Sequence, residues 1–520
     1  MLVGYVSDEN DCAIAGADIE LESGDRSISV RSKASGAVYA DLEPGCYQVA
    51  IACSGYGAKR STVKVRTDIP VRFRLLSDGM TGFMWPKCVQ AGETSEYCVH
   101  STRNFRLDLW RYGWEKHHIR TLGWCGEHGA GAMKQITPDG DYSQSGVNWN
   151  RVGYTLEYQK HAVVAPERSG LYYLHARTDD GQVCNFPWIV SPRKPTSSIA
   201  VLFSTMTWNA YNSFGGRSNY FSQSGLPRTP AVNVRQDLDR YTDPDTWPYK
   251  STAAPLSFQR PEPANTIPES DRITDPIAGR IQSAFAPGQW RLVGWLDREG
   301  LDYDLYSDTS LHFDRLDLDQ YRVLVLDNHP EYWTPEMYQR VKQWVMERGG
   351  QLMYLGGCGL YAEAELPDEQ TMLCRREGYF DMRKETPDQL LGINYTHGGF
   401  QTGDPYRVLQ PDHWIFEGTG LSQGSLFGQN SVHLRCPGGA SAHELDKIPV
   451  SSSFDLKPLA KGTNPDNQGA ELVVFETASG GAVFSTGSLC WILSLVVDES
   501  VSAITRNVFM RFLRCRDEPL

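Results

Sequence analysis

The sequence predicts a multidomain protein in which two N-terminal β-sandwiches precede an α/β domain of the flavodoxin-like or amidotransferase-like kind. The chain has 520 residues, enough for several domains. Residues 1–192 contain short runs of alternating apolar and polar residues separated by turn residues, which is typical of antiparallel sheets. Beyond residue 196 the runs become uniformly apolar and alternate with a helical pattern, which is typical of a parallel sheet covered by helices.

The first predicted domain covers residues 1–77. Leu2–Val6, Ala17–Leu21 and Tyr47–Ile51 alternate apolar and polar side chains, with glycine-containing turns between them. The order G-x-V-x-D, A-I-A-G-A-D-I and A-D-L-E-P-G-C-Y resembles that of the carboxypeptidase-regulatory-like, or prealbumin-like, β-sandwich. The resemblance implies a scaffold or a contact surface.

The second predicted domain covers residues 78–195. Phe105–Trp110 and Gly170–Arg177 are strand-like, and the residues between 123 and 150 are rich in Gly, Asp and Ser, as in a long loop. We interpret this region as a second β-sandwich, which the linker Ser191–Thr196 joins to the rest of the chain.

The third predicted domain covers residues 196–520. Ser198–Phe203 and Tyr321–Leu326 are the apolar runs expected for strands buried on both faces. A helix is predicted from Thr334 to Gly350, because Thr334 can cap it, a proline follows, and two glycines end it. Gln351–Leu355 is the next predicted strand, and strands followed by a short helix are predicted after residue 471.

Composition excludes several classes of partner. The formal net charge is -13, the sequence contains no basic stripe, and nucleic acid is therefore not expected as a partner. No run of about 18 apolar residues is present, so no membrane is expected. The N-terminal residues lack the pattern of a secretory signal, and the 12 cysteines are scattered, so we expect reduced thiols and a cytoplasmic protein.

Polar or glycine-rich segments follow three of the predicted strands of the third domain. They are Trp208–Ser218, Asn328–Trp333 and Gly356–Gly359. Ligands of open α/β sheets bind at the carboxyl ends of the strands. We therefore expect the three segments to converge on one crevice.

These segments also carry a family resemblance. The motifs T-W-N-A-Y-N-x-x-G-G-R-S, N-H-P-E-Y-W, Y-L-G-G-x-G and F-E-T-x-x-G-G-A-V-F-S-x-G-S occur in this order. Together they resemble the large-subunit family of N,N-dimethylformamidase, over the chain from about residue 196 to its C-terminus. The resemblance implies a hydrolase that cleaves the C–N bond of a small N-substituted amide.

The resemblance further implies a mononuclear Fe³⁺ centre held by two tyrosines and one glutamate. By motif, the first tyrosine falls on Tyr211 and the glutamate on Glu331. We assign the second tyrosine to Tyr249, with Tyr241 and Tyr220 as alternatives. Phenolates and carboxylates are hard anionic donors that suit a small trivalent ion, and three of them would neutralise its charge.

Two further residues are candidates for proton transfer. His329 lies two residues before Glu331, and the stretch G-x-x-x-x-E-L-D places the acidic residue that the family uses as a general base on Glu444. A metal would polarise the amide and bind the attacking water, and Glu444 or His329 would take the proton of that water.

The chain departs from the family at Cys358, where the family motif G-G-N-G has asparagine. The change alters a contact to substrate, so dimethylformamide itself is not assumed. It also supports an alternative, a metal-independent cysteine hydrolase with a Cys358–His329 pair on a strand-to-helix elbow, in which residues 360–364 are helical.

A third alternative is a non-enzymatic binding protein. Under the enzymatic interpretations the ligand is a small amide. The family's large subunit works with a small, mainly helical subunit, which nothing in this chain resembles, so we expect either a separate partner or its complete loss. A homo-oligomer is also expected.

Overall fold

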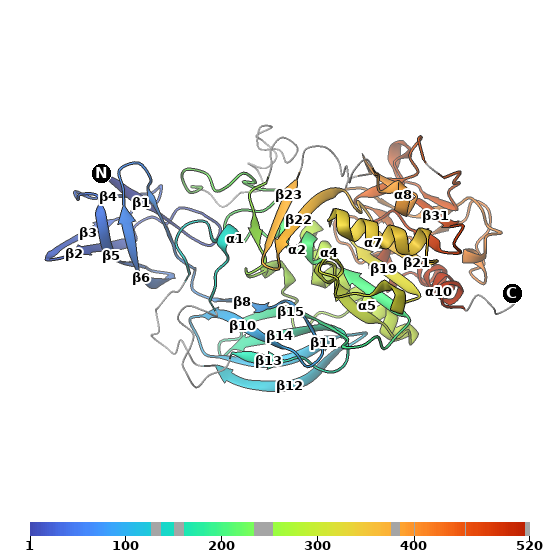
Figure 1. The fold of residues 1–520 in the computed structure, drawn as a ribbon, viewed down its shortest axis with the longest axis horizontal. Coiled ribbons are helices and arrows are strands. Elements are labelled where there is room, and N and C mark those ends of the chain that lie inside the picture. Colours follow the sequence, from blue (N-terminus) through green and yellow to red (C-terminus); the bar gives the residue numbers. More distant parts are fainter. Residues whose placement is uncertain are drawn as a thin grey trace.

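The structure is a computed structural model that describes residues 1–125, 137–149, 161–232, 253–375, 385–399, 401–452 and 454–514. Figure 1 shows three groups of elements, with the N-terminal sheets at one end of the molecule and the C-terminal helix α10 (Glu499–Leu513) at the other. The strands β8 to β15 form a second group in the lower part of this view.

The N-terminal group is a pair of small sheets that share one core. One sheet has the strand order β4 (Ala37–Tyr39), β1 (Leu2–Ser7), β7 (Val71–Arg74), and the other has β3 (Arg26–Arg31), β2 (Asp18–Ser23), β5 (Gly45–Cys53), β6 (Tyr56–Val65). Alternate residues of both sheets, such as Val6 and Ile19, are buried against each other. This is the expected β-sandwich.

The second group is also a two-sheet sandwich. One sheet has the order β13 (Ala162–Val164), β10 (Thr94–Ser101), β8 (Met80–Trp85), and the other has β12 (Lys116–Cys125), β11 (Phe105–Tyr112), β14 (Gly170–Thr178), β15 (Val183–Ser191), β9 (Cys88–Gln90). The two sheets share a core that contains Met84, Leu107 and Trp188. The strand β12 extends two residues into the predicted loop, and the described residues 137–149 of that loop include a short helix, whereas residues 126–136 lie outside the described residues.

The third group is built on a nine-stranded sheet. Its order is β18 (Asp304–Ser307), β16 (Ile199–Phe203), β19 (Val323–Asn328), β21 (Gln351–Gly356), β32 (Ala482–Ser485), β31 (Glu471–Glu476), β30 (Ala460–Gly462), β26 (Tyr406–Val408), β27 (Leu426–Phe427). The first five of these strands pair in parallel, and the rest pair antiparallel.

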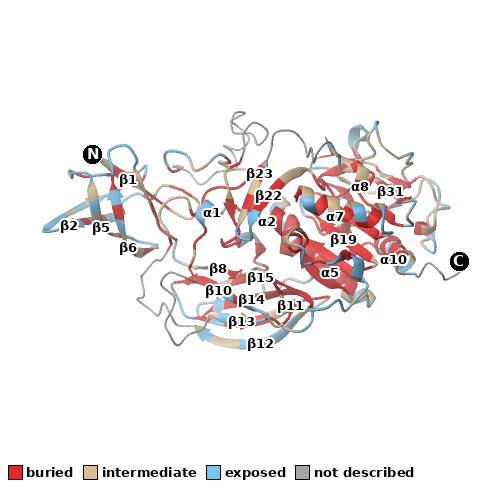
Figure 2. Cartoon of the chain, viewed as in Figure 1, coloured by how far each residue is buried: buried red, intermediate tan, exposed pale blue. Residues whose placement is uncertain are grey.

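Helices cover both faces of the parallel strands. The helices α5 (Ala286–Glu299), α9 (Trp491–Leu495) and α10 share a core with alternate residues of β16 and β19, and α7 (Pro335–Met346) shares the core on the opposite face. Figure 2 shows β19 and α5 mostly in red, as buried elements, whereas β2 and β12 are largely exposed. The predicted strands and the predicted helix of this region are confirmed, with Thr334 capping α7 through Met337 N at 3.3 Å. The narrower flavodoxin-like or amidotransferase-like class and the domain boundaries at residues 77 and 195 stay predictions.

One predicted element is wrong. Residues 360–364 were expected to be helical, but Ala362–Asp368 form the strand β22 of a sheet with the order β17 (Leu256–Ser257), β23 (Thr371–Arg375), β22, β20 (Tyr332–Trp333). Ala364 and Leu366 are buried while Glu363 and Glu365 are half-buried, which is the alternation of a strand. Pairing with two neighbouring strands outweighs the helix propensity of alanine, glutamate and leucine here.

Shorter helices and strands complete the described chain. They are α1 (Tyr142–Ser145), α2 (Thr205–Tyr211), α4 (Gly279–Ala284), α6 (Asp308–His312), α8 (Asp388–Leu391), β24 (Asn394–Gly398), β25 (Gly403–Asp404), β28 (Ser441–Ala442) and β29 (Leu445–Lys447), with 3₁₀ turns η2 (Pro263–Asn265), η3 (Leu318–Gln320), η4 (Trp414–Phe416) and η5 (Pro465–Asn467). Among the described residues, no helix has the length and apolarity needed to cross a bilayer.

Asp327, near the end of β19, is a buried acid whose carboxylate has no hydrogen-bond partner among the described residues. Burial raises the pKa of Asp327 well above its usual value of 3.8. Between pH 3.8 and the folded-state pKa, Asp327 therefore keeps a proton in the folded chain that it loses in the unfolded chain. The stability that protonated Asp327 allows is fully present below about pH 3.8 and is lost progressively as pH rises toward the folded-state pKa.

Replacing Asp327 by asparagine is expected to increase the free energy of unfolding by about 1–3 kcal/mol near pH 7, with a larger gain at pH 8 than at pH 5. Urea unfolding of both proteins across this pH range measures the effect. Asp304→Asn is the matched control, because buried Asp304 accepts hydrogen bonds from Thr196 N at 2.7 Å and Thr196 Oγ1 at 2.5 Å. This control should destabilise the protein, and a pH-independent gain for Asp327→Asn would contradict the explanation.

Candidate active site

The segments that follow three parallel strands converge, as predicted, at one edge of the central sheet. In the sheet β16 lies between β18 and β19. The chain first forms β18 on one side of β16 and then forms β19 on the opposite side. Such a position creates a crevice at the carboxyl ends of the strands. Tyr211 follows β16, His329 and Glu331 follow β19, and Cys358 follows β21.

Tyr211 is the last residue of α2, and a buried arginine fixes the backbone around it. The guanidinium of Arg260 donates hydrogen bonds to the carbonyl oxygens of Asn209 at 3.2 Å, Asn212 at 3.1 Å and Phe214 at 2.7 Å. These contacts lie on both sides of Tyr211, so the position of its backbone is strongly determined. Its side chain is buried and points toward the residues that follow β19.

Two phenols meet on one buried carboxylate. Tyr211 donates to Glu331 Oε2 at 2.6 Å, and Tyr220 donates to Glu331 Oε1. The two tyrosine rings are stacked with their centroids 4.5 Å apart. Burial, and then the negative charge of Glu331, raise the pKa of Tyr220 well above its usual value; burial is also the main cause of the raised pKa of Tyr211.

The predicted second tyrosine, Tyr249, lies outside the described residues, as does the alternative Tyr241. The other alternative, Tyr220, is the phenol that contacts Glu331 together with Tyr211. The assignment of the second tyrosine therefore stays a prediction.

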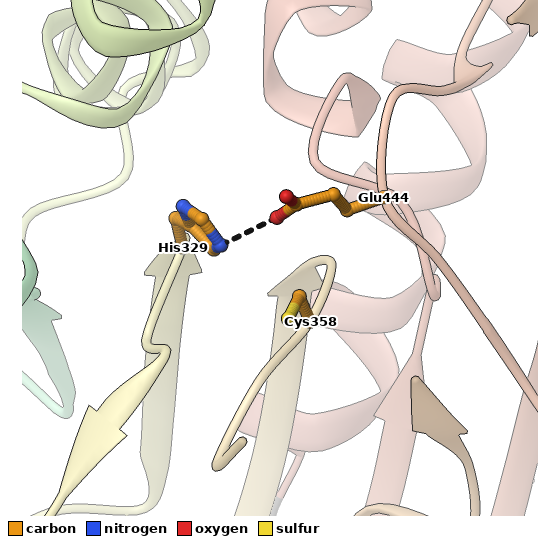
Figure 3. A group of neighbouring side chains, drawn as sticks. All are labelled: His329, Cys358 and Glu444. Atoms are coloured by element: carbon orange, nitrogen blue, oxygen red, sulfur yellow. Dashed lines mark ion pairs between the residues drawn. The ribbon is translucent and has the colours of Figure 1, made fainter. Parts of the chain in front are cut away.

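His329, Glu444 and Cys358 form a second, adjoining cluster. Figure 3 shows His329 and Cys358 at the ends of neighbouring strands and Glu444 reaching toward them from a later loop. The Nε2 atom of His329 lies 2.7 Å from Glu444 Oε2 and 3.5 Å from Glu331 Oε2. Potential ligand atoms of His329, Cys358 and Glu444 all lie within 4.8 Å of one another.

Arg280 connects the two clusters. It lies in α4, and its Nη2 atom is 2.5 Å from both the hydroxyl of Tyr211 and Glu444 Oε1. The guanidinium also lies over the rings of Tyr211 and Tyr220, 5.1 Å and 5.4 Å from their centroids. It thus places a positive charge among two carboxylates and two phenols.

Glu444 is a buried carboxylate that stays ionised. Burial alone would raise its pKa, but the positive charge of Arg280, and next the contact with His329, outweigh burial and hold the pKa of Glu444 well below its usual range. The carboxylate of Glu444 is therefore in the form that can accept a proton, and its lowered pKa makes it a weaker base than an ordinary glutamate.

The glycines after β21 allow Glu444 to approach. A Cβ atom on Gly357 would lie 2.2 Å from the backbone oxygen of Glu444, so a larger residue would displace that loop. Asp446 holds the same loop, because it accepts hydrogen bonds from Cys358 N at 2.9 Å and the hydroxyl of Tyr354 at 2.7 Å. The local sequence Gly-Gly-Cys therefore serves to bring Glu444 to the site.

The environment of Cys358 does not favour a nucleophile. Burial, and then the negative charges of Glu444, Glu331 and Asp446, raise the pKa of its thiol well above the usual value. The backbone at Cys358 has a φ of 51°, as in a sharp turn, but the helix expected for an elbow is the strand β22. His329 lies against Glu444. A thiolate is the reactive form of cysteine, so the pair predicted from sequence lacks its activation.

The buried donors suit a hard cation. Buried Glu331, Glu444 and Tyr211 and half-buried Tyr220 present oxygen atoms to one region. The Nδ1 atom of His329 is buried without a hydrogen-bond partner among the described residues, which leaves a nitrogen available beside them. Carboxylates and phenolates are donors for hard metal ions, so the residues fit the predicted metal chemistry.

Arg280 and Asp446 were not predicted as site residues. Arg280 lies within residues 275–283, which contain no recognisable motif. Only the fold brings Arg280 next to Tyr211. Asp446 lies in the predicted stretch G-x-x-x-x-E-L-D, so the presence of a second acid two residues after Glu444 was a signal for it.

Comparison with known proteins matches residues 106–503 to the family model described as "N,N-dimethylformamidase beta subunit-like, C-terminal". The beta subunits of N,N-dimethylformamidase from Paracoccus aminophilus and Alcaligenes sp are each 26% identical over 434 residues, which covers 68% of this chain and 53% of each relative. The chain thus spans about half the length of the curated relatives it matches. Among solved structures, the major pilin subunit of Bacillus cereus matches 40% of this chain and 73% of its own length at 13% identity, with a TM-score of 0.15.

Proposed function

The chain belongs to the N,N-dimethylformamidase beta subunit-like family, and from that premise we propose that it is an amidohydrolase that cleaves a small N-substituted amide with a metal-activated water. The observation that supports this most directly is the enclosed group of Tyr211, Glu331, His329 and Glu444 at the carboxyl edge of the sheet. The relatives are named for dimethylformamide hydrolysis, whereas Cys358 replaces the family's asparagine here. The substrate class is therefore a small amide rather than dimethylformamide specifically.

We assign Tyr211, Glu331 and one further tyrosine as the residues that would hold a single Fe³⁺. The further tyrosine is Tyr249 by family resemblance, and Tyr220 is the competing candidate because its hydroxyl already donates to Glu331. When bound, such an ion supplies a Lewis acid that polarises an amide carbonyl and lowers the pKa of water. The protein would contribute an enclosed pocket of anionic oxygens.

The proton transfers fall to Glu444. Its carboxylate would take the proton of the attacking water and return it to the nitrogen of the leaving amine. His329 orients this carboxylate from one side, at 2.7 Å, and Arg280 from the other, at 2.5 Å. Arg280 also keeps the carboxylate ionised, so we propose it as a positioning residue.

The assembly is a further proposal. Both relatives are named as beta subunits, so we propose that a separate smaller subunit accompanies this chain. The predictions of a homo-oligomer and of a cytoplasmic location are retained.

Metal analysis and visible spectroscopy of the purified protein test the proposal. We expect about one iron per chain and a broad phenolate-to-iron absorption band, which weakens in Tyr211→Phe. Comparing Tyr249→Phe, Tyr241→Phe and Tyr220→Phe identifies the second phenolate, because only the true ligand should change the band. Tyr173→Phe, a buried tyrosine of the second sandwich, is the matched control.

An iron-free, colourless protein obtained with iron supplied would overturn the metal proposal. Inactivation by alkylation of Cys358, with activity that survives chelation, would instead support the cysteine hydrolase. Absence of any activity, iron or amide binding would support a binding protein.

A further inference from the structure

A cavity of about 540 Å³ lies where the two sandwiches and the α/β region meet. Its walls come from residues 9–10 and 76–81, from His100 and residues 182–184, and from residues of the α/β region that include Phe214, Phe285 and Tyr211. Tyr211 is the residue of the proposed active site that lines the cavity, and its hydroxyl contacts Glu331 and Arg280. The cavity therefore borders the proposed active site at Tyr211.

The N-terminal wall is firmly attached to the loop that carries Tyr211. Gly215 N donates to Glu9 O at 2.7 Å, and the guanidinium of Arg74 donates to Gly215 O at 3.0 Å. At Gly216, with φ of 90°, a Cβ atom would lie 2.4 Å from the Cβ of Asp11, so only glycine permits this close contact. The wall formed by residues 9–10 is thus a fixed part of the cavity.

This wall lies outside the part of the chain that the family model matches. The match begins at residue 106, whereas residues 9–10, 76–81 and His100 precede it. The cavity therefore combines a family-type active site with a wall that the family match does not include. Substrate preference can therefore depend on a part of the chain that precedes the matched C-terminal region.

The lining has a defined chemical character. Apolar side chains, among them Met80, Phe214 and Phe285, alternate with two carboxylates, Glu9 and Asp78. Glu9 is held in place by hydrogen bonds from the backbone and hydroxyl of Ser77. The described lining contains no lysine or arginine, so it disfavours anionic groups and admits neutral or cationic ones.

The volume exceeds what a simple amide requires. A cavity of this size falls in the range of roughly 300–1,000 Å³ that accommodates ligands of drug-like size. Dimethylformamide has only a few non-hydrogen atoms and would leave most of the space empty.

We propose that this cavity binds the substituent of a larger, neutral or cationic N-substituted amide and so determines substrate specificity. The proposal rests on the proposed amidohydrolase function and names its substrate class. The amide group would lie beside Tyr211, and an apolar substituent would extend toward Met80 and Phe285, with Asp78 excluding carboxylates.

Three probe amides test the proposal: dimethylformamide, N-benzylformamide, and N-benzylformamide with a para-carboxylate. The wild-type protein should have the highest kcat/KM for N-benzylformamide. Ala264→Trp fills the cavity and should lower the ratio of kcat/KM for N-benzylformamide to that for dimethylformamide by about tenfold or more. Asp78→Lys, at an exposed position, should improve the relative kcat/KM for the carboxylate probe by about fivefold.

Asp25→Lys is the matched control, because Asp25 is an exposed aspartate of the N-terminal sandwich that does not line the cavity. Hydrolysis of dimethylformamide with no preference for N-benzylformamide, or ratios that neither variant changes, would overturn the specificity proposal and leave the amidohydrolase function standing. If no probe is hydrolysed, the proposed function fails. Calorimetry then decides on the cavity: binding of N-benzylformamide that Ala264→Trp abolishes supports it, and no binding overturns it.

Discussion

Replacing Glu444 by glutamine is expected to lower kcat by about 10²–10⁴-fold while the iron content stays unchanged. The glutamine keeps the size of the side chain but cannot accept the proton of water. Its amide oxygen can still accept from Arg280, which contacts Glu444 Oε1 at 2.5 Å, so the fold should be preserved. Steady-state kinetics, metal analysis and thermal unfolding of the same preparation measure the three properties.

Two variants accompany this experiment. Glu444→Asp retains a carboxylate and should recover part of the activity, whereas Glu476→Gln, at an exposed position at the end of β31, should have none of the effect. If Glu444→Gln loses its iron, Glu444 is a metal ligand. If it keeps wild-type kcat, the general base lies elsewhere.

The strands and the helix around the site could be predicted because their signals are local. Val323–Leu326 and Leu352–Leu355 are uninterrupted apolar runs, and α7 has its cap, proline and terminal glycines within one short stretch. The strand β22 was mistaken for a helix because its residues favour helices individually. Only its pairing with β20 and β23, which are distant in sequence or follow it, reveals its structure.

The prediction of the site residues depended on several motifs that occur in a fixed order, and not on any single residue. Tyr211, the pair His329 and Glu331, and Glu444 come from three segments, each more than 100 residues from the next, and the family motifs identified them. Arg280 had no such motif. The role of Arg280 follows from its contact with Tyr211, which no periodicity or residue spacing in the sequence indicates. The cavity wall formed by residues 76–81 could not be predicted either, because it depends on how separate sheets pack together.

Arg280 gives the second large effect that we expect. Its guanidinium lies 2.5 Å from Glu444 Oε1 and is, after burial, the largest influence on the pKa of that carboxylate, which it lowers. Removing the charge in Arg280→Ala should therefore raise the pKa of Glu444, so that the carboxylate takes up a proton at higher pH. A base with a depressed pKa is active down to acid pH, and this advantage is lost in the variant.

We accordingly expect Arg280→Ala to lower kcat by about 10²-fold near neutral pH, with a larger loss at pH 6 than at pH 8. The acid limb of the pH profile of kcat/KM should move to higher pH, and added guanidinium should restore activity by occupying the vacated volume. Arg291→Ala is the matched control, since buried Arg291 contacts backbone oxygens of Pro287 and Asp275 away from Glu444. An equal loss at every pH without rescue would mean that Arg280 acts through packing alone, because the loss of a structural side chain does not select the protonation state of Glu444.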